Sequence, residues 1–269
     1  MIPWLNPAAP PRFPPAHQAL REPNGLLAAG GELSPEWLLA AYRQGIFPWF
    51  CEGEPLLWWS PDPRMVLAPG GLRLTRSLLK TLRSRRFELR CDTAFAQVME
   101  GCAARREAEG ALSQEGQQPG TQPHTWIGPQ ILAAYCRIHE MGWAHSMEAW
   151  LDDELVGGLY GVAIGRVFYG ESMFHRVTDA SKVAFAHMVR LLEQRNFAVI
   201  DCQMTTAHLR SLGGHEIARE AFLTGLDRWT QEDVRPGKWS DANLDFDWHL
   251  APQEKSARIR DQIGEQSGE

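Results

Sequence analysis

The spacing of apolar residues changes along the chain and divides it into helical and strand-like stretches. In the first half, apolar positions recur at helical spacing, which predicts helices over 35–45, 74–83, 94–107 and 129–142. From residue 143 the pattern alternates, which predicts strands over 143–150, 154–164 and 167–171. A helix from residue 179, a strand over 197–203 and helices over 205–212 and 218–230 complete the prediction.

A meander of strands followed by a helix and a further strand indicates an α+β fold. The order is compatible with a mixed β-sheet flanked by helices, as in the acetyltransferase-like (GNAT-like) fold. Acetyl-CoA users hold the phosphates of that cofactor with a glycine-containing turn before the central helix. Residues 175–180 read His-Arg-Val-Thr-Asp-Ala instead. We therefore expect an acyl donor other than acetyl-CoA, and no cofactor.

Changes in composition suggest three parts. Residues 1–64 form an N-terminal arm and small domain, and their dense aromatic run over 45–64 is broken by prolines and is predicted to hold no regular element. Residues 65–235 form the larger domain, with a mobile insertion over 109–122 that is rich in Gly, Gln, Ser and Pro. Residues 236–269 form a C-terminal tail that we expect to be disordered after about residue 250, because it is charged and lacks aromatic residues there.

Composition excludes several classes of protein. The 269 residues contain no run near the roughly 20 apolar residues of a membrane span, and the first residues lack the pattern of a signal peptide. Five scattered cysteines without a Cys-x-x-Cys pair favour neither a disulfide framework nor a zinc ribbon. No metal-binding spacing occurs among the nine histidines, so we expect no metal. A cytoplasmic protein, expected to be a monomer, is the simplest interpretation.

The net charge of −6 argues against general affinity for nucleic acid, but one stretch is strongly basic. It carries one acid, Glu88, among seven cationic side chains: Arg73, Arg76, Lys80, Arg83, Arg85, Arg86 and Arg90. A local surface of this kind can bind phosphates whatever the total charge of the protein. The alternative is an ordinary solvated helix face.

The segment Asp201-Cys202-Gln203, at the end of an apolar strand, is the main candidate for chemistry. Because side chains alternate along a strand, Asp201 and Gln203 are predicted to face one side and Cys202 the other. The carboxylate of Asp201 would accept from the amide of Gln203, which leaves the Gln203 carbonyl to hold an amine N–H. A polar pair that merely ends the strand is the alternative. Cys202 is interpreted as a structural thiol, and its role as a nucleophile is the rival hypothesis.

Two further features suggest binding. Glu171 lies between apolar stretches, where a carboxylate often meets a cation, although a surface ion pair would explain it equally well. Trp49, Trp58, Trp59 and Trp126 lie in or beside loops with proline and glycine, where an indole can stack on a nucleobase. Anchoring of the core is the alternative for some of them.

Taken together, these segments resemble one family, the bacterial leucyl/phenylalanyl-tRNA–protein transferases. The resemblance extends over roughly residues 18 to 230, and the order of the motifs is more specific than any one of them. The motifs are Arg21-Glu22-Pro23-Asn24-Gly25-Leu26-Leu27, Gly45-Ile46-Phe47-Pro48-Trp49-Phe50, Trp58-Trp59-Ser60-Pro61-Asp62-Pro63-Arg64, Thr125-Trp126-Ile127, Ala144-His145-Ser146, Glu154-Leu155-Val156-Gly157-Gly158, Gly170-Glu171-Ser172-Met173-Phe174, Ala180-Ser181-Lys182 and Ile200-Asp201-Cys202-Gln203.

The resemblance implies a function and a set of partners. The enzyme would move Leu, also Phe and with Met as a further candidate, from its charged tRNA to the α-amino group of a protein beginning with Arg or Lys. The product would be an N-degron, recognised by the N-end rule of protein degradation. The family has a small N-terminal domain and a larger acetyltransferase-like domain, in agreement with the missing acetyl-CoA turn.

The resemblance also implies roles for particular residues. Asp201 and Gln203 match the catalytic pair, and Glu171 matches a carboxylate that recognises the basic first residue of the acceptor. Trp49 and Trp126 match residues around the 3′-terminal adenosine of the tRNA. The side-chain pocket for the transferred amino acid corresponds to Leu159, Met173, Phe185, Met188, Leu192 and Ile200. The acceptor stem of the tRNA would lie on the basic stretch, at Arg73, Arg76, Lys80, Arg83, Arg85 and Arg86.

Two departures from the family pattern and two rival functions remain at this point. Residues 109–122 read as an insertion before Trp126, and Met188 and Leu192 stand where aromatic pocket residues are expected. The rivals are a cysteine-dependent amidohydrolase that uses Cys202 and a non-catalytic RNA-binding module built on the basic helix and the tryptophans.

Overall fold

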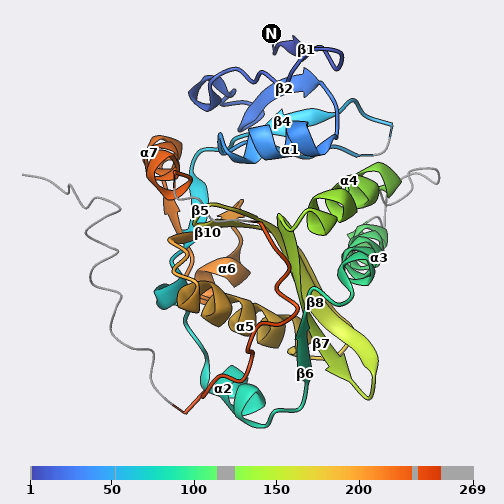
Figure 1. The fold of residues 1–269 in the computed structure, drawn as a ribbon, viewed down its shortest axis with the longest axis vertical. Helices are drawn as coiled ribbons and strands as arrows, with labels where there is room; N and C mark the ends of the chain where they lie inside the picture. The colour runs from blue at the N-terminus through green and yellow to red at the C-terminus, as the bar shows by residue number, and fades with distance from the viewer. Residues whose placement is uncertain (1, 52, 114–124, 232–235, 250–269) are drawn as a thin grey trace, which may run out of the picture.

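A computed structural model describes the chain except for residue 1, residue 52 and the ranges 114–124, 232–235 and 250–269; the side chains of 105–113 are also outside the description. Two β-sheets organise the described residues (Figure 1). The first has the strand order β1-β2-β4-β3, from β1 (Trp4–Leu5), β2 (Leu26–Gly30), β4 (Leu57–Trp59) and β3 (Phe47–Pro48). Helix α1 (Pro35–Tyr42) packs beside it and buries Trp37, Leu38 and Tyr42.

The larger sheet has seven strands in the order β11-β5-β10-β9-β8-β7-β6. Their bounds are β5 Arg64–Leu67, β6 Glu88–Cys91, β7 Ala144–Leu151, β8 Glu154–Ile164, β9 Val167–His175, β10 Val199–Gln203 and β11 His215–Ile217. Neighbouring strands are antiparallel except β9 and β10, which are parallel, so the sheet is mixed. The predicted α+β fold with a mixed sheet flanked by helices is confirmed.

Helices cover both faces of this sheet, as Figure 1 shows. Helices α3 (Phe95–Ser113) and α4 (Pro129–Glu140) share one apolar cluster with the N-terminal sheet. Helices α2 (Arg76–Arg83) and α5 (Ala180–Gln194) belong to a second cluster on the other face. Short α6 (Ala207–Ser211), α7 (Arg219–Trp229) and single 3₁₀ turns at Ala16–Gln18 and Pro69–Gly71 complete the described elements.

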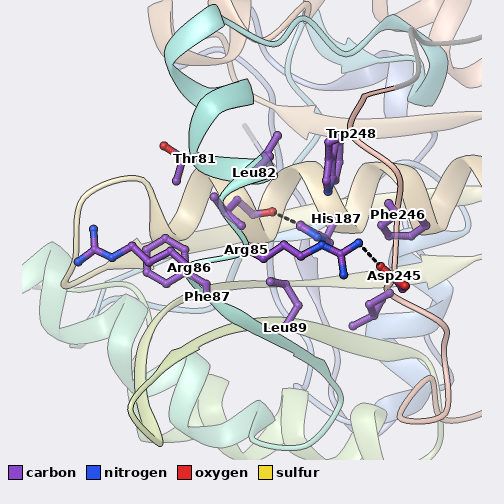
Figure 2. Close-up of a pocket in the computed structure, with 12 residues that line it drawn as sticks. Thr81, Leu82, Arg85, Arg86, Phe87, Leu89, His187, Asp245, Phe246 and Trp248 are labelled. Carbon is purple, nitrogen blue, oxygen red and sulfur yellow. Dashed lines mark hydrogen bonds and ion pairs between the residues drawn. The ribbon is translucent and has the colours of Figure 1, made fainter.

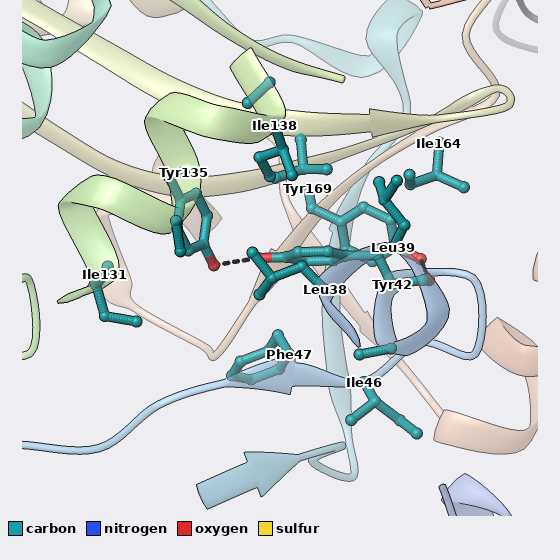
Figure 3. Packing of buried hydrophobic residues seen from close by; sticks show 14 of the residues in the cluster. Leu38, Leu39, Tyr42, Ile46, Phe47, Ile131, Tyr135, Ile138, Ile164 and Tyr169 are labelled. Carbon is teal, nitrogen blue, oxygen red and sulfur yellow. Dashed lines mark hydrogen bonds between the residues drawn. The ribbon is translucent and has the colours of Figure 1, made fainter. Parts of the chain in front are cut away.

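The first cluster joins the two sheets, because α1 and α4 meet there. Figure 3 shows Tyr42 of α1 and Tyr135 of α4 pointing toward one another among Leu38, Ile131 and Phe47. Their hydroxyls are 2.5 Å apart in a fully buried position. A phenol buried in an apolar cluster needs a polar partner, and each of these two phenols supplies one for the other.

Two predictions about local structure are wrong. The aromatic run over 45–64 is not irregular throughout, because β3 and β4 pair there, with Phe47 opposite Trp59 and Pro48 opposite Trp58. The predicted loop over 109–122 begins too early, because α3 continues to Ser113; the range 114–122 lies outside the described residues. In β3 and β4, the aromatic side chains favour the strand conformation, and their packing outweighs the effect of the nearby prolines.

The segment 236–249 has no regular structure, yet it packs against the second cluster. Trp239 and Trp248 are each 5% exposed, and the backbone N–H of Trp239 donates to the carboxylate of Asp92 at 2.8 Å. The Trp239 ring stacks on His145 with centroids 3.5 Å apart. We refer to residues 236–249 as the docked segment; the sequence pattern does not predict its packing. The range beyond it, for which disorder was predicted, lies outside the described residues.

Candidate functional site

A cavity of about 590 Å³ lies where the N-terminal sheet meets β8, β9, β10 and α5. Phe47, Pro48 and Trp49 reach it from the N-terminal sheet and the loop that follows, and Trp126 reaches it from the loop before α4. The larger sheet contributes Glu171 and Gln203. The structure therefore brings together residues that are far apart in the sequence and that were predicted to share one site.

Apolar side chains form part of the cavity lining, which we call the apolar pocket. Five of the six residues predicted for the side-chain pocket line it: Leu159, Met173, Phe185, Met188 and Ile200. Leu192 is fully buried in the second cluster and is absent from the cavity lining, so its predicted contact with a bound side chain is not supported. The lining can take a large apolar side chain, and the two methionines leave its shape adaptable.

The end of β10 departs from the predicted alternation. The pairing of β10 with β5 shifts register between Asp201 and Gln203, and Gln203 adopts a φ of 61°. The carboxylate of Asp201 accepts the backbone N–H of Gln203 at 2.8 Å and a bidentate pair of bonds from Arg64, at 2.9 and 2.6 Å. The predicted bond between the Asp201 and Gln203 side chains is wrong, because Arg64 and a backbone N–H bind the carboxylate and the Gln203 amide donates to Glu171.

The Gln203 side chain turns toward Glu171 instead. Its Nε2 donates to Oε1 of Glu171 at 2.9 Å, which leaves Gln203 Oε1 as an acceptor. Tyr42 donates to the same Glu171 oxygen at 2.7 Å, and the Tyr135 hydroxyl lies 3.5 Å from Oε2. We refer to Tyr42, Tyr135, Glu171 and Gln203 as the Glu171 cluster.

The electrostatics of the Glu171 cluster are unusual. Within the described part of the chain, Glu171 receives hydrogen bonds from two phenols and an amide, and from no cationic side chain. Burial raises the pKa of Glu171 to about 8, against the effect of these hydrogen bonds, and the charge of Asp201 adds to the rise. A buried carboxyl group in this state would be stabilised as the ion by an incoming cation.

Cys202 has little of the character of a nucleophile. It packs against the second cluster, although it also contributes to the cavity lining. Burial, reinforced by the charge of Asp201, raises the pKa of its thiol well above the ordinary range. Because the thiolate is the reactive form, the observations do not favour the amidohydrolase interpretation.

The tryptophans predicted to contact a nucleobase differ in exposure. Trp49 is 39% exposed at the cavity, and its carbonyl accepts the indole N–H of Trp59 at 2.6 Å. Trp126 is buried, with one part of its surface in the cavity. Trp58 is fully buried and bonds to the Gly30 carbonyl, so it anchors the core.

The basic stretch lies on α2 and in the segments before and after it, and none of its side chains lines the cavity. Arg73, Arg76, Lys80, Arg83 and Arg86 are exposed, and Arg83 also donates to the carbonyl of Trp248. Arg85 forms an exposed ion pair with Asp245 at 2.8 Å, beside a small cavity of about 240 Å³ (Figure 2). The docked segment therefore engages two of the basic side chains. Arg90 pairs with Glu88.

Sequence reasoning missed three residues of the site: Arg64, Tyr42 and Tyr135. Arg64 lies inside one of the motifs of the family resemblance, but no role was assigned to it. The two tyrosines lie in predicted helices, where nothing in the sequence distinguishes them from core residues. Only the fold brings these three to β10 and β9.

Among the described residues, no group of His, Cys, Asp and Glu side chains could hold a metal ion. The helices in this part of the chain include none with the length and apolar character of a membrane span.

Comparison with known proteins gives consistent matches. The profile described as "Leucyl/phenylalanyl-tRNA protein transferase" matches residues 66–227, and that of the family's N-terminal domain matches residues 31–62. The leucyl/phenylalanyl-tRNA–protein transferase of Azoarcus sp. (strain BH72) is 63% identical over 250 residues, which cover 93% of this chain and 100% of that protein. The corresponding protein of Aromatoleum aromaticum is 59% identical over 240 residues, which cover 89% of this chain and 95% of that protein.

Among solved structures, a GCN5-related N-acetyltransferase from Kribbella flavida is similar to 68% of this chain and 61% of its own. The overlap has a TM-score of 0.31 and a sequence identity of 13%.

Proposed function

Because this chain belongs to the leucyl/phenylalanyl-tRNA–protein transferase family, we propose that it transfers Leu or Phe from aminoacyl-tRNA to proteins that begin with Arg or Lys. The chain is an enzyme, an aminoacyltransferase with aminoacyl-tRNA and protein substrates. The preference for a basic first residue and the creation of an N-degron are parts of the proposal. The observation that carries it is the cavity in which an apolar pocket, two tryptophans, Gln203 and Glu171 meet.

The proposed reaction is the aminolysis of an ester. The lone pair of the acceptor amine attacks the ester carbonyl carbon, a C–N bond forms, and the bond from that carbon to the ribose oxygen breaks. The amine loses one proton, and the departing ribose oxygen gains one. An α-amino group has a pKa of about 8, so a substantial part of it is neutral close to neutral pH.

Gln203 would position the amine in this step. With its Nε2 bound to Glu171, its Oε1 is left to accept an N–H from the amine and to stabilise the positive charge that develops on nitrogen. A carbonyl oxygen is far too weak a base to remove the proton, so Gln203 acts through orientation. Correct orientation of two reactants can supply several kcal/mol of the barrier.

The remaining parts of the cavity are assigned by their chemistry. Trp49 and Trp126 would hold the 3′-terminal adenosine, since an aromatic ring offers stacking to any base. Leu159, Met173, Phe185, Met188 and Ile200 would hold the side chain of the transferred amino acid. Glu171 would pair with the cationic side chain of the acceptor's first residue, which would stabilise the ionised carboxylate.

The acceptor stem of the tRNA would lie along the basic stretch. The exposed side chains of Arg73, Arg76, Lys80 and Arg86 are the best placed, and Arg83 and Arg85 would contribute where they are released from the docked segment. Contacts of this kind to phosphates give binding that weakens as the salt concentration rises.

The direct test is transfer of labelled Leu from charged tRNA to a peptide that begins with Arg, with a peptide that begins with Gly as control. We expect transfer to the first peptide alone. Gln203→Ala should lower the rate by about 10²-fold while charged tRNA still binds, and Gln97→Ala, at an exposed glutamine, should leave the rate unchanged. Absence of transfer by the unaltered protein, or equal transfer to both peptides, would contradict the proposal.

A further inference from the structure

Arg64, the first residue of β5, is held rigidly inside the protein. Its side chain is 0% exposed, and its guanidinium carbon lies 5.0 Å from the ring centroid of Phe47 and 4.7 Å from that of Phe222. Its Nη1 donates to the carbonyl of Gly45 at 3.0 Å. A guanidinium between two aromatic faces, with a third contact to the backbone, has little freedom to move.

The remaining donors of Arg64 fix the carboxylate of Asp201. Nε and Nη2 bind the two oxygens of Asp201 in the bidentate geometry that only arginine can provide. Neither side chain belongs to the lining of the cavity, and both are fully buried. Asp201 is therefore placed to act on its neighbours in the protein rather than on a substrate.

The neighbour that Asp201 acts on is Gln203. Its backbone N–H reaches Asp201 Oδ1 at 2.8 Å, across the register shift of β10. A φ of 61° is disfavoured for a residue with a side chain, so a local bond must offset its cost. In this conformation the Gln203 amide turns to Glu171 instead of following the strand alternation.

We infer that Arg64 is a positioning residue of the transfer reaction, which acts through Asp201 to hold the backbone conformation that directs Gln203 into the cavity. The inference rests on the proposed role of Gln203 in orienting the amine. Asp201 and Gln203 are then linked through the backbone: Asp201 binds the backbone N–H of Gln203, and Glu171 binds the Gln203 side chain.

Arg64→Lys tests the inference, since lysine keeps the charge and loses the bidentate fork. We expect kcat to fall by about 10²-fold, because a displacement near 1 Å at the reacting centre has that effect. The KM values for charged tRNA and for the Arg-starting peptide should stay within about twofold, because Arg64 is fully buried and does not itself line the cavity. Arg219→Lys is the matched control: Arg219 is also buried, and it donates to the Ser60 carbonyl without contacting Asp201 or Gln203. Its kcat should be unchanged.

A double-mutant cycle separates positioning from general stability. In a Gln203→Ala background, where no side-chain amide remains to be directed, Arg64→Lys should lower kcat no further. A merely structural role would lower kcat by the same factor in both backgrounds and would overturn the inference. Unchanged kcat in Arg64→Lys alone would overturn it too.

Arg64→Lys could fail to fold, so a second variant removes both charges at once. Apolar replacement of a buried ion pair is often tolerated, so Arg64→Met with Asp201→Leu should fold and show the same loss of kcat. Turnover of this pair at the rate of the unaltered protein would overturn the inference. If the unaltered protein transfers Leu to the Arg-starting peptide while Arg64→Lys keeps its full kcat, the proposed function stands and the inference alone fails.

Discussion

Asp92 and Glu171 are both buried carboxylates, yet their surroundings differ in kind. Asp92 accepts bonds from the Nδ1–H of His145 and from the backbone N–H groups of Ser146 and Trp239. Burial opposes its ionisation, but these bonds outweigh burial and lower the pKa of Asp92. Glu171 has two phenols and an amide instead, and burial raises its pKa to about 8. The first carboxylate is satisfied as an ion, and the second is not.

The difference separates a carboxylate in a structural cluster from the carboxylate that we propose binds the acceptor. Asp92 lies away from the cavity lining, and its partners tie β7 and the docked segment together. Glu171 contributes to the cavity lining, and among the described residues no cationic side chain donates a hydrogen bond to it. Burial and a polar environment are common to both, so neither property alone identifies a functional carboxylate. The informative property is a charge that the protein itself leaves uncompensated.

Glu171→Gln should have the largest effect on this contrast. It keeps the hydrogen-bonding shape and removes the charge, so discrimination between Arg-starting and Gly-starting peptides should fall by roughly 30-fold or more, equivalent to about 2 kcal/mol. Because the pKa of Glu171 is raised, its contribution to stability is present at low pH and is lost as pH rises toward about 8. The stability of the variant relative to the unaltered protein should therefore increase as pH rises from 5 to 8. Denaturant unfolding and competition between the two peptides measure the two effects.

The same carboxyl group predicts a pH dependence. Below about pH 8 the fraction of ionised Glu171 falls nearly tenfold per unit, so the KM for an Arg-starting peptide should rise as pH falls. The titration of the acceptor amine affects the unaltered protein and Glu171→Gln equally. The informative quantity is therefore the ratio of their KM values for the Arg-starting peptide. A ratio that stays constant between pH 6 and 8 would contradict an ionised partner for the basic side chain.

Asp92→Ala should affect stability and leave the chemistry alone. Loss of the carboxylate leaves the Ser146 and Trp239 N–H groups without an acceptor, and unfolding free energy should fall by about 1–3 kcal/mol. The lowered pKa of Asp92 means that its stabilisation is present above its ordinary pKa and is lost as pH falls through the lowered value. Steady-state kinetics of the folded variant should give an unchanged kcat. A tenfold loss of kcat at constant stability would break the contrast with Glu171.

Asp245→Asn should have the smallest effect. Its ion pair with Arg85 is exposed at both ends, so the unfolding free energy should change by no more than about 0.5 kcal/mol. Release of Arg85 should strengthen tRNA binding about twofold and steepen its dependence on salt. Asp241→Asn, at an exposed acid on the same segment, controls for the change in net charge. Identical salt slopes for the two variants would remove Arg85 from the phosphate-binding surface.

Much of the fold followed from apolar spacing, because its elements are long and strongly patterned. The helix over 129–142 and the strands over 143–150 and 154–164 correspond to α4, β7 and β8 within two residues at each end. The sequence does not predict the short strands β3 and β4, because strands of two or three residues are too short to show a periodic pattern of apolar residues. The docked segment escaped for a different reason: Trp239 and Trp248 bury themselves singly, without an element around them.

The site was predicted at the level of residues and not of bonds. Gln203 and Glu171 were singled out separately, and the bond between them depends on a register shift that strand alternation cannot express. Arg64 and Asp201 lie 137 positions apart in the chain, so their ion pair exists only after β5 and β10 align. Tyr42 and Tyr135 belong to helices whose apolar pattern treats them as ordinary core.

For work that attaches a label or a fusion partner to this protein, the anchoring of Trp239 and Trp248 defines where the attachment can begin. A cut placed before Trp239 would strip an aromatic cover from His145 and would leave Asp92 without one of its donors. A cut between the two tryptophans would keep that cover and uncover His187, whose ring lies 4.9 Å from that of Trp248. Linkers are therefore best joined beyond residue 249, where the indoles that close this face of the protein stay in place.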